Sequence, residues 1–417
     1  MKRSLICISL LCLILIGCNV REKKNTQIKN IFSLPIGYDK EELGLLPEKS
    51  ASEAAIDFCY NNGFFYISDK INNKILKVTE TGVIVLTIYN QENYPHLIPN
   101  SSNTIDTDTT SDVNREYLKL YSSYPLEHPG VIAADIEKNI YVVNREPMHK
   151  KYGEQNQIED EFILKFDSHG QLQYKIGKNG SSMSSADVEP FNYISRVATD
   201  VNSNLIVMEG YSEDLKIYKY SKDGTLLYQT MLTKSKLPLS KNEMNAVVLL
   251  IDAVAGYAED EILVTYQFVS REVTNSIELF QLEYEKIFCY NMKEDKFDKM
   301  LLKTSPEYED LSKLKFDPAV MELYGDMKKI QRPMPVFIGS DSYSNIYLYQ
   351  EKLPLDSLII KEFRLMKYNE NGRLESLRHV KYSHDIVYNS NMYLTYNGRV
   401  LGYVVKENEV TFVSVNE

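Results

Sequence analysis

The chain contains six histidines, whose side chains bind metals and transfer protons most readily near neutral pH. They are spread along the sequence without a His-x-His or His-Glu-x-x-His pattern, at His96, His128, His149, His169, His379 and His384. His96, His128 and His149 fall in segments that are predicted below to be loops on one face of the fold. A metal site or acid–base site assembled there in space stays open, but the spacing itself predicts neither.

Two acidic segments gather oxygen ligands in the manner of a calcium loop, Asp106-Thr-Asp108 and Asp200-Val-Asn202-Ser-Asn204. Neither has the central glycine or the distant glutamate of an EF-hand, and the second is one copy of a turn that recurs through the chain. No Gly-x-Ser-x-Gly elbow occurs, and Gly177-Lys-Asn-Gly180-Ser-Ser lacks the residue order of a phosphate-binding loop. We therefore predict no catalytic, cofactor-binding or metal-binding residue.

The N-terminus carries the most specific motif in the chain. Lys2 and Arg3 form a basic start, and the apolar run from Leu5 to Ile16 is too short to span a bilayer as a helix. Leu15-Ile16-Gly17-Cys18 then resembles the bacterial lipobox, whose cysteine receives a diacylglycerol. An ordinary secretory signal that ends near a cysteine is the alternative.

This resemblance implies a lipoprotein signal peptide over residues 1–17, lipid attachment at Cys18, a polar tether over residues 18–30 and a folded domain over residues 31–417. Several acyl chains on one cysteine make a stable anchor. We therefore expect a protein held to a bacterial membrane at the cell envelope, facing the periplasm or the exterior.

Only two cysteines would remain besides the lipidated one. Cys7 and Cys12 would leave with the signal peptide, and Cys59 and Cys289 would stay. An exported protein could join these two in a disulfide. The repeats described below place them on opposite sides of a ring, which favours two separate thiols packed in strands.

The composition excludes one class of partner and favours one class of fold. Removal of the two basic residues of the signal peptide would leave 45 basic and 58 acidic residues, a net charge of −13. A net-acidic chain without a basic cluster argues against binding to nucleic acid. The 31 tyrosines, together with Val and Ile at alternating positions, favour β-strands.

Two turn signatures recur and define the elements that must position any site. In the first, an Asp near the end of a small apolar strand precedes an Asn that opens an apolar-aromatic strand, as in Asp57–Asn61, Asp135–Asn139, Asp200–Asn204 and Asp341–Asn345. In the second, a strand ends in a polar turn, as in Thr79–Gly82, Asp167–Gly170, Ser221–Gly224, Asn369–Gly372 and the glycine-less Asn291–Lys296. Asn, Asp and Gly adopt the left-handed backbone conformations that tight hairpins require.

The copies predict six blades of four antiparallel strands. Their approximate ranges are 52–89, 131–177, 194–231, 246–304, 335–381 and 384 to the end. The sixth blade lacks one strand, whereas Ile31–Pro35 is a strand without a hairpin partner, so its insertion there would close a ring. A pair of β-sandwiches and a seven-bladed ring with a hidden blade in residues 90–130 are the alternatives.

The repeat resembles that of NHL-type and related six-bladed β-propellers, most clearly over residues 131–230 and 337–380. With the lipobox, the chain resembles bacterial NHL-like propeller lipoproteins, a family largely of unknown function. The resemblance implies an all-β fold, a six-bladed β-propeller closed by an N-terminal strand. It implies no particular activity, because a propeller serves many functions.

Successive connections in an antiparallel blade alternate between the two faces of the ring. Both tight turn signatures then share one face, and seven insertions share the other, namely Tyr94–Gly130, Arg145–Asp160, Gly177–Asn192, Thr233–Met244, Ser270–Glu285, Ser305–Met334 and Gln350–Leu358. The spacing within Glu307–Ile330 predicts helices on both sides of Pro318. Long loops on a rigid scaffold usually carry binding sites, although insertions also cost little free energy.

We therefore expect an exported, lipid-anchored propeller that binds a protein, a small molecule or a glycan on its long-loop face. The alternative is a propeller hydrolase or lyase, metal-dependent or not, with a site in or above the central channel; a structural envelope protein is a third interpretation. Residues expected to line the channel are Ile56, Asp57, Ala133, Ala134, Ala198, Thr199, Ile338 and Gly339. Because most are small and apolar, we predict a plugged channel and favour the binding module over the enzyme.

Overall fold

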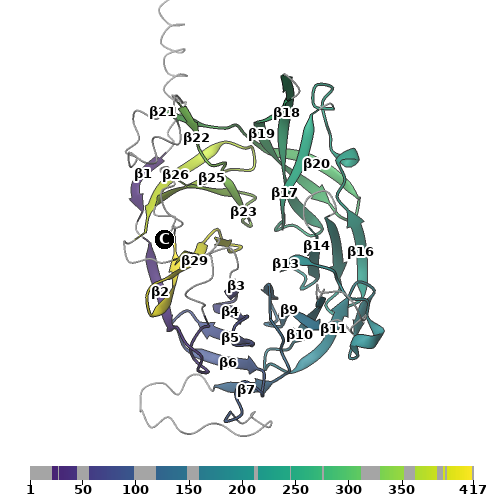
Figure 1. The fold of residues 1–417 in the computed structure, drawn as a ribbon, viewed down its shortest axis with the longest axis vertical. Coiled ribbons are helices and arrows are strands. Elements are labelled where there is room, and N and C mark those ends of the chain that lie inside the picture. The colour runs from purple at the N-terminus through teal and green to yellow at the C-terminus, as the bar shows by residue number, and fades with distance from the viewer. Residues whose placement is uncertain are drawn as a thin grey trace, which may run out of the picture.

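The computed structural model is a closed ring of small sheets, the blades, around a central channel (Figure 1). It describes residues 21–26, 28–44, 56–97, 119–147, 159–210, 215–244, 246–274, 277–310, 329–351, 362–382, 388–389 and 392–415. Within these ranges the only helices are two short 3-10 turns, η1 (Ser185–Asp187) and η3 (Lys234–Lys236). No helix in this part of the chain has the length and apolarity needed to cross a bilayer.

The first three blades each contain four antiparallel strands that run in sequence order from the channel to the rim. Blade one contains β3 (Ile56–Asn61), β4 (Phe64–Asp69), β5 (Lys74–Thr79) and β6 (Ile84–Tyr89). Blade two contains β8 (Ile132–Ala134), β9 (Ile140–Pro147), β10 (Glu159–Phe166) and β11 (Leu172–Gly177). Blade three contains β13 (Ile194–Thr199), β14 (Leu205–Glu209), β15 (Lys216–Tyr220) and β16 (Leu226–Met231).

The remaining three blades complete the ring, and the predicted six-bladed β-propeller is confirmed. Blade four contains β17 (Val247–Ala255), β18 (Glu261–Thr274), β19 (Ile277–Asn291) and β20 (Lys296–Thr304). Blade five contains β23 (Val336–Ser340), β24 (Ile346–Glu351), β25 (Glu362–Tyr368) and β26 (Leu374–Lys381). Blade six contains the short inner strands β27 (Tyr388–Asn389) and β28 (Tyr393–Leu394), then β29 (Val400–Val405), β30 (Glu409–Ser414) and β2 (Lys29–Pro35).

The N-terminal strand closes the ring as predicted. β2 pairs antiparallel with β30, and Phe32 lies opposite Phe412 in the register. The two rings stack with their centroids 4.8 Å apart. First and last parts of the chain thus share one blade, which removes two open strand edges.

Three blades carry an additional strand at the rim that the sequence did not predict, namely β7 (Leu120–Ser123), β12 (Gly180–Ser182) and β1 (Arg21–Thr26). β7 pairs in parallel with β6 of blade one, so this segment extends an existing blade and does not start a seventh. β1 pairs in parallel with β26 of blade five. Residues 21–26 of the predicted tether therefore pair through their backbone with the outer strand of blade five.

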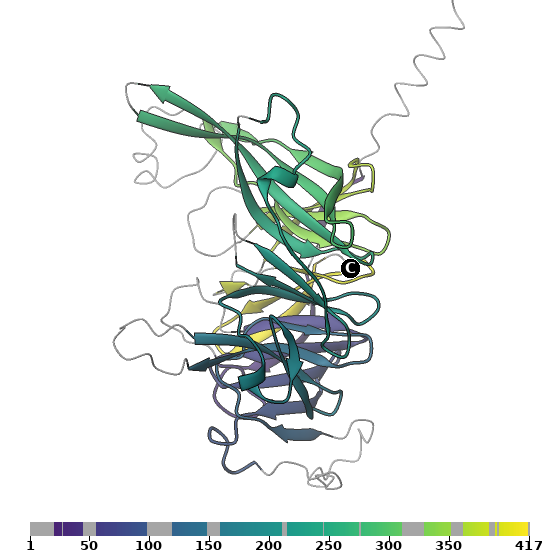
Figure 2. The same ribbon diagram turned by 90° about the vertical axis from the view of Figure 1, so that its right-hand side faces the viewer.

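Two predicted insertions differ from expectation. Ser270–Glu285 is a two-stranded ribbon, because β18 and β19 stay paired as far as Thr274 and Ile277, and Figure 2 shows this green ribbon projecting from one side of the ring. The helices predicted for Glu307–Ile330 are wrong at both ends, where β21 (Tyr308–Asp310) pairs with β22 (Lys329–Gln331). The rest of that segment, residues 311–328, lies outside the described residues.

The tight turns and the insertions lie on opposite faces. Tight turns of neighbouring blades contact each other, as where Asn62 Nδ2 donates to Ile136 O and Ser342 N donates to Tyr396 O. Antiparallel pairing then places the described ends of the seven insertions on the other side. We call the side of the tight turns the plain face and the other side the long-loop face.

The turn signatures fold as predicted in three of four cases. The Oδ1 atoms of Asp135, Asp200 and Asp341 each accept the backbone N–H of the Asn four residues later, at 2.9 Å. Asp57 is the exception: β3 continues through Asn61, and the turn uses Asn62 and Gly63, both with positive φ. The carboxylate of Asp57 is thereby released from turn formation.

A buried lysine on the third strand joins successive blades. Lys77 donates to Ser168 O at 3.5 Å, and Lys165 donates to Lys222 O at 2.6 Å, each reaching a turn of the next blade. Lys219, 1% exposed, lies 2.8 Å from Asp200 Oδ2 and 2.6 Å from Asp260 Oδ1. Burial lowers the pKa of Lys219, but the hydrogen bonds and charges of the two aspartates outweigh burial and raise its pKa above the usual value.

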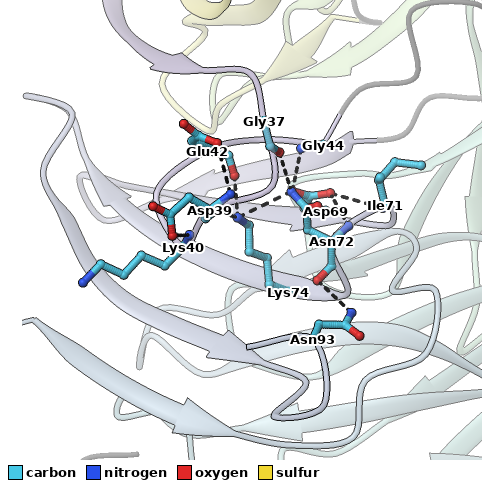
Figure 3. A network of polar contacts seen from close by, with 10 residues as sticks. All are labelled: Gly37, Asp39, Lys40, Glu42, Gly44, Asp69, Ile71, Asn72, Lys74 and Asn93. Atoms are coloured by element: carbon cyan, nitrogen blue, oxygen red, sulfur yellow. Dashed lines mark hydrogen bonds and ion pairs between the residues drawn. The ribbon is translucent and has the colours of Figure 1, made fainter. Parts of the chain in front are cut away.

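The segment that follows β2 is bonded to blade one by another buried lysine, Lys74, shown in Figure 3. Lys74 Nζ donates to Asp39 O at 2.6 Å and to Glu42 O at 2.5 Å. The carboxylate of Asp69 accepts the backbone N–H of Gly44 at 2.9 Å. Burial lowers the pKa of Lys74 to about 8. The segment directly after β2, the strand that closes the ring, is thus bonded to blade one as well.

Cys59 and Cys289 are free and buried, as predicted. Cys59 lies on β3 of blade one and Cys289 on β19 of blade four. Cys289 takes the position that Lys77, Lys165 and Lys219 hold in their blades, and its thiol donates to Glu261 Oε1 at 3.1 Å. Burial raises the pKa of both thiols.

Candidate functional site

The central channel holds an open cavity of about 680 Å³. Inner strands of all six blades line it, including seven of the eight predicted residues: Asp57, Ala133, Ala134, Ala198, Thr199, Ile338 and Gly339. The eighth, Ile56, packs between blades one and six instead. The prediction of a plugged channel is wrong, because small side chains on the inner strands leave the centre unfilled.

Two charged residues that were not predicted from the sequence form an ion pair on the wall of this cavity. Arg196 on β13 and Asp252 on β17 form an ion pair with Nη2 and Oδ1 3.2 Å apart, and both side chains are partly exposed, 38% and 31%. The register of β13 shifts between Ile194 and Arg196, and that of β17 shifts between Leu250 and Asp252. Irregularities of this kind re-aim side chains, and here they precede the two charged residues directly.

Asp57 is the third charged member of the group. Its Oδ2 accepts the backbone N–H of Ile132 from blade two at 3.0 Å. Burial raises the pKa of Asp57 to about 6, opposed by the backbone N–H groups of Ile132 and Phe58 and by the charge of Arg196. Burial also raises the pKa of Asp252, again opposed by Arg196.

These three residues lie in one layer of the channel. Each comes three or four residues before the last paired residue of its inner strand, which is Asn61, Thr199 or Ala255. The layer offers one guanidinium and two carboxylates to the cavity. Five tyrosines from four blades also line it, namely Tyr60, Tyr257, Tyr349, Tyr393 and Tyr396.

This arrangement can hold a small polar molecule. Carboxylates accept hydrogen bonds from hydroxyl or amino groups, guanidinium donates in a planar fork, and tyrosine rings offer flat apolar surface. An acid with a pKa near 6 can also exchange a proton near neutral pH. The chemistry available is therefore recognition of a polar ligand, with proton transfer as an added capacity.

The described histidines lie in separate segments, with His379 on β26 of blade five. His96, His128 and His169 are exposed, and His169 lies in a tight turn on the plain face. His149 and His384 lie outside the described residues, as does Cys18. Among the residues described, no group of three or more His, Cys, Asp or Glu side chains is placed to hold a metal ion.

The signal for the channel site was present in the sequence but weak. Arg196 interrupts Ile194-Ser-Arg-Val-Ala-Thr199, and Asp252 interrupts Leu249-Leu-Ile-Asp-Ala-Val254, both otherwise mainly apolar or small. A charge at an inward position of such a strand is a candidate for a site. The bulges that turn these side chains inward carry no comparable sequence pattern.

No protein-family model and no curated protein matches this chain. Among solved structures it is similar to the Pan2 WD40 domain of Neurospora crassa, with 6% identity over 87% of this chain and 75% of that chain and a TM-score of 0.36. It is also similar to polysaccharide lyase Uly1, with 8% identity, 93% and 100% coverage and a TM-score of 0.38. For hydrazine synthase of Kuenenia stuttgartiensis the identity is 10%, the coverage 89% and 99%, and the TM-score 0.37.

Likenesses this distant assign neither a family nor a function, and the propeller assignment rests on the strand pairing itself. Membership of an NHL-like lipoprotein family stays a prediction.

Proposed function

We propose that this protein is an exported, lipid-anchored propeller that binds a small hydroxyl-rich ligand, such as a glycan unit, in its central channel. The observation that carries the proposal is the layer of Asp57, Arg196 and Asp252 in an open cavity. One guanidinium between two carboxylates suits a neutral ligand with several hydroxyl groups, because such a ligand both donates and accepts hydrogen bonds. The tyrosines supply a surface on which a sugar ring can pack.

The cavity reaches the plain-face turns at Asn62, Ile136 and Tyr396, but its charged layer lies toward the long-loop face, which we expect to be the entrance for ligand. Asp57 and Arg196 lie in the early part of β3 and β13, and both strands start on that face. A ligand entering there would pass the insertions before it meets the charged layer. This keeps the predicted binding face and adds the channel beneath it as the place where specificity resides.

Calorimetric titration with a panel of defined oligosaccharides and monosaccharides tests the proposal. We expect the wild-type protein to bind at least one member, and Arg196→Met and Asp252→Asn each to weaken that binding by tenfold or more. Lys222→Met, which changes an exposed lysine on the plain face, is the control and should bind like wild type. A panel ligand that binds all three variants equally would place the site elsewhere.

A lyase or hydrolase reaction in the same channel is the second candidate. The observation that favours it is the pKa of Asp57 near 6, which suits a general acid or base. If the protein is an enzyme, incubation with the ligand that it binds will release new reducing ends, and Asp57→Asn will abolish release while the ligand still binds. If the wild-type protein binds its ligand without turning it over, the enzyme interpretation is wrong and the protein is a binding module.

A further inference from the structure

The plain face carries a ring of exposed apolar side chains around the mouth of the channel. In blades two to six, the turn between the first and second strands places one such residue at its tip: Ile136, Val201, Tyr257, Tyr343 and Tyr396. Their exposed fractions are 55%, 40%, 39%, 76% and 57%. In blade one, Asn62 occupies the corresponding turn. We call these five residues the plain-face ring.

The shape of the ring restricts what could cover it. Turns that occupy equivalent positions in successive blades lie at similar heights along the axis of a propeller, so their tips are close to one plane. Tyr343 and Tyr396 are held together by the hydrogen bond from Ser342 N to Tyr396 O, 2.8 Å long. A planar ring of separated apolar tips fits a planar and deformable partner better than it fits the irregular surface of a folded protein.

The chemistry of the ring points the same way. Tyrosine is enriched where membrane meets water, because its ring is apolar and its hydroxyl stays hydrated. The same turns carry Glu137, Lys138 and Glu259, so their charge is mixed and gives no attraction to anionic lipid. A surface of zwitterionic phospholipid is the partner that this combination fits.

The path of the N-terminus supplies the second, independent observation. β1 begins at Arg21, whose register partner Ser376 lies near the start of β26, shortly after the tight turn Asn369–Gly372 of blade five. The chain therefore enters the ring from the plain-face side. Figure 2 agrees, because the C-terminal end of β30, which pairs with β2, lies on the side opposite the β18–β19 ribbon.

Cys18 stands three residues before Arg21. Three residues span on the order of 10 Å when fully extended. Because β1 belongs to the ring, an acylated Cys18 could not hold the propeller far from the bilayer. The anchor would bring blade five to the membrane by its plain-face side, where Tyr343 is the most exposed member of the ring.

We propose that the plain face lies against the membrane, with the plain-face ring at the lipid–water interface and the long-loop face turned away. This inference rests on the proposed lipid anchor at Cys18. This orientation explains why the plain face has only short turns, because long loops there would collide with the bilayer. It also leaves the channel open for ligand only on the side away from the membrane.

Depth-dependent quenching of a fluorescent probe tests the orientation in the full-length lipidated protein, reconstituted in phosphatidylcholine vesicles with nitroxide-labelled lipid. One variant carries Lys222→Cys on the plain face and the other Glu407→Cys in the exposed turn between β29 and β30, on the long-loop face. Cys59 and Cys289 are buried and will not take the probe in the folded protein. We expect the nitroxide lipid to quench the probe at position 222 at least threefold more strongly than the probe at position 407.

Two further measurements separate the two proposals. If the protein does not float with the vesicles, the anchor has failed; if it floats but both probes are quenched equally, the orientation is overturned. In the Cys18→Ser variant, Tyr343→Ser with Tyr396→Ser should reduce residual binding to vesicles about fivefold or more, whereas Phe280→Ser, an exposed apolar residue on the β18–β19 ribbon, should not. Equal residual binding by both variants, or a face-to-face dimer of the Cys18→Ser protein that the two tyrosine changes dissolve, would also contradict the proposal.

Discussion

Arg196 on β13 lies 3.2 and 3.3 Å from the two carboxylate oxygens of Asp252 on β17, and so joins blade three to blade four inside the channel. An ion pair between two inner strands is not needed to hold the ring, because buried apolar side chains already pack between these blades. A charged pair that is partly exposed to a cavity adds little stability. Its position in the channel, together with Asp57, is better explained by what enters the channel.

The charge of Arg196 should control the protonation of the channel. In Arg196→Met we expect the pKa values of Asp57 and Asp252 to rise above those of the wild type, because Arg196 favours the ionised form of both. A carbon-13 NMR titration of the aspartate carboxylates measures both values. Arg373→Met, at an exposed position of the plain face, is the matched control and should leave both titrations unchanged.

The contribution of Asp57 to the free energy of unfolding should be larger in mild acid than at neutral pH. Its pKa is about 6 in the folded state and 3.8 in its ordinary state, so the folded protein binds more protons than the unfolded chain between these values. The free energy of unfolding then falls as pH rises from about 4 to 6. Asp57→Asn should remove this fall and raise the free energy of unfolding at pH 7 by roughly 1–3 kcal/mol, since the side chain is only partly exposed to the channel.

Urea denaturation at pH 4, 5, 6 and 7 measures the effect as the difference between variant and wild type. Other carboxylates also titrate in this range, and the difference cancels them. A difference that does not grow with pH would mean that Asp57 is solvated and titrates near its ordinary value. Asp298→Asn on the rim strand β20 serves as the control for a carboxylate that is more exposed.

Much of the fold followed from the sequence because its cause is local. The turns at Asp135, Asp200 and Asp341 are each closed by hydrogen bonds within five residues, so the residue types that make them can be read in order. The unpaired strand Ile31–Pro35 predicted the closure of the ring, because blade six lacked one strand and this was the strand without a hairpin partner. Periodicity and turn chemistry were sufficient for these features.

The site could not be derived in the same way because its causes are distant in the sequence. Asp57 matches the turn signature by type and spacing, yet its partner is the backbone of Ile132, which lies in the next blade. Arg196 and Asp252 meet only because two strand irregularities turn them inward. The pairing of residues 21–26 with β26 was likewise unpredictable, since Arg21–Thr26 is polar and has no apolar alternation.

Lys219 should be among the residues whose loss costs most stability. Lys219→Met would leave Asp200 and Asp260 facing each other without the cation that both contact, in a site where the lysine is 1% exposed. Removing one partner of a buried ion pair typically costs about 3–5 kcal/mol. Urea denaturation measures this, and Lys222→Met, which removes an exposed lysine 3.8 Å from Glu137, should change the free energy of unfolding by less than about 1 kcal/mol. Similar small losses in both variants would show that the aspartates are rescued by protonation or solvent.

The closure of the ring gives the last prediction. Phe32 packs against Phe65, with ring centroids 5.0 Å apart, and against Phe412, and it is 7% exposed. It therefore joins the N-terminal strand to both blade six and blade one. Phe32→Ala should cost about 3–5 kcal/mol, the usual result for a buried phenylalanine, whereas Phe280→Ala, at a side chain 59% exposed, should cost less than about 0.5 kcal/mol.

The pattern of the loss distinguishes closure from simple packing. If β2 closes the ring as a separate unit, Phe32→Ala should accelerate hydrogen exchange of backbone amides in β30 and β3 together. Local detachment of β2 would expose both neighbouring blades. Amides of β14 and β15 in blade three, on which β2 has no direct hold, should keep their wild-type protection. Exchange that accelerates equally in all blades would mean that the ring opens only by global unfolding, and that β2 contributes packing without acting as a separate unit.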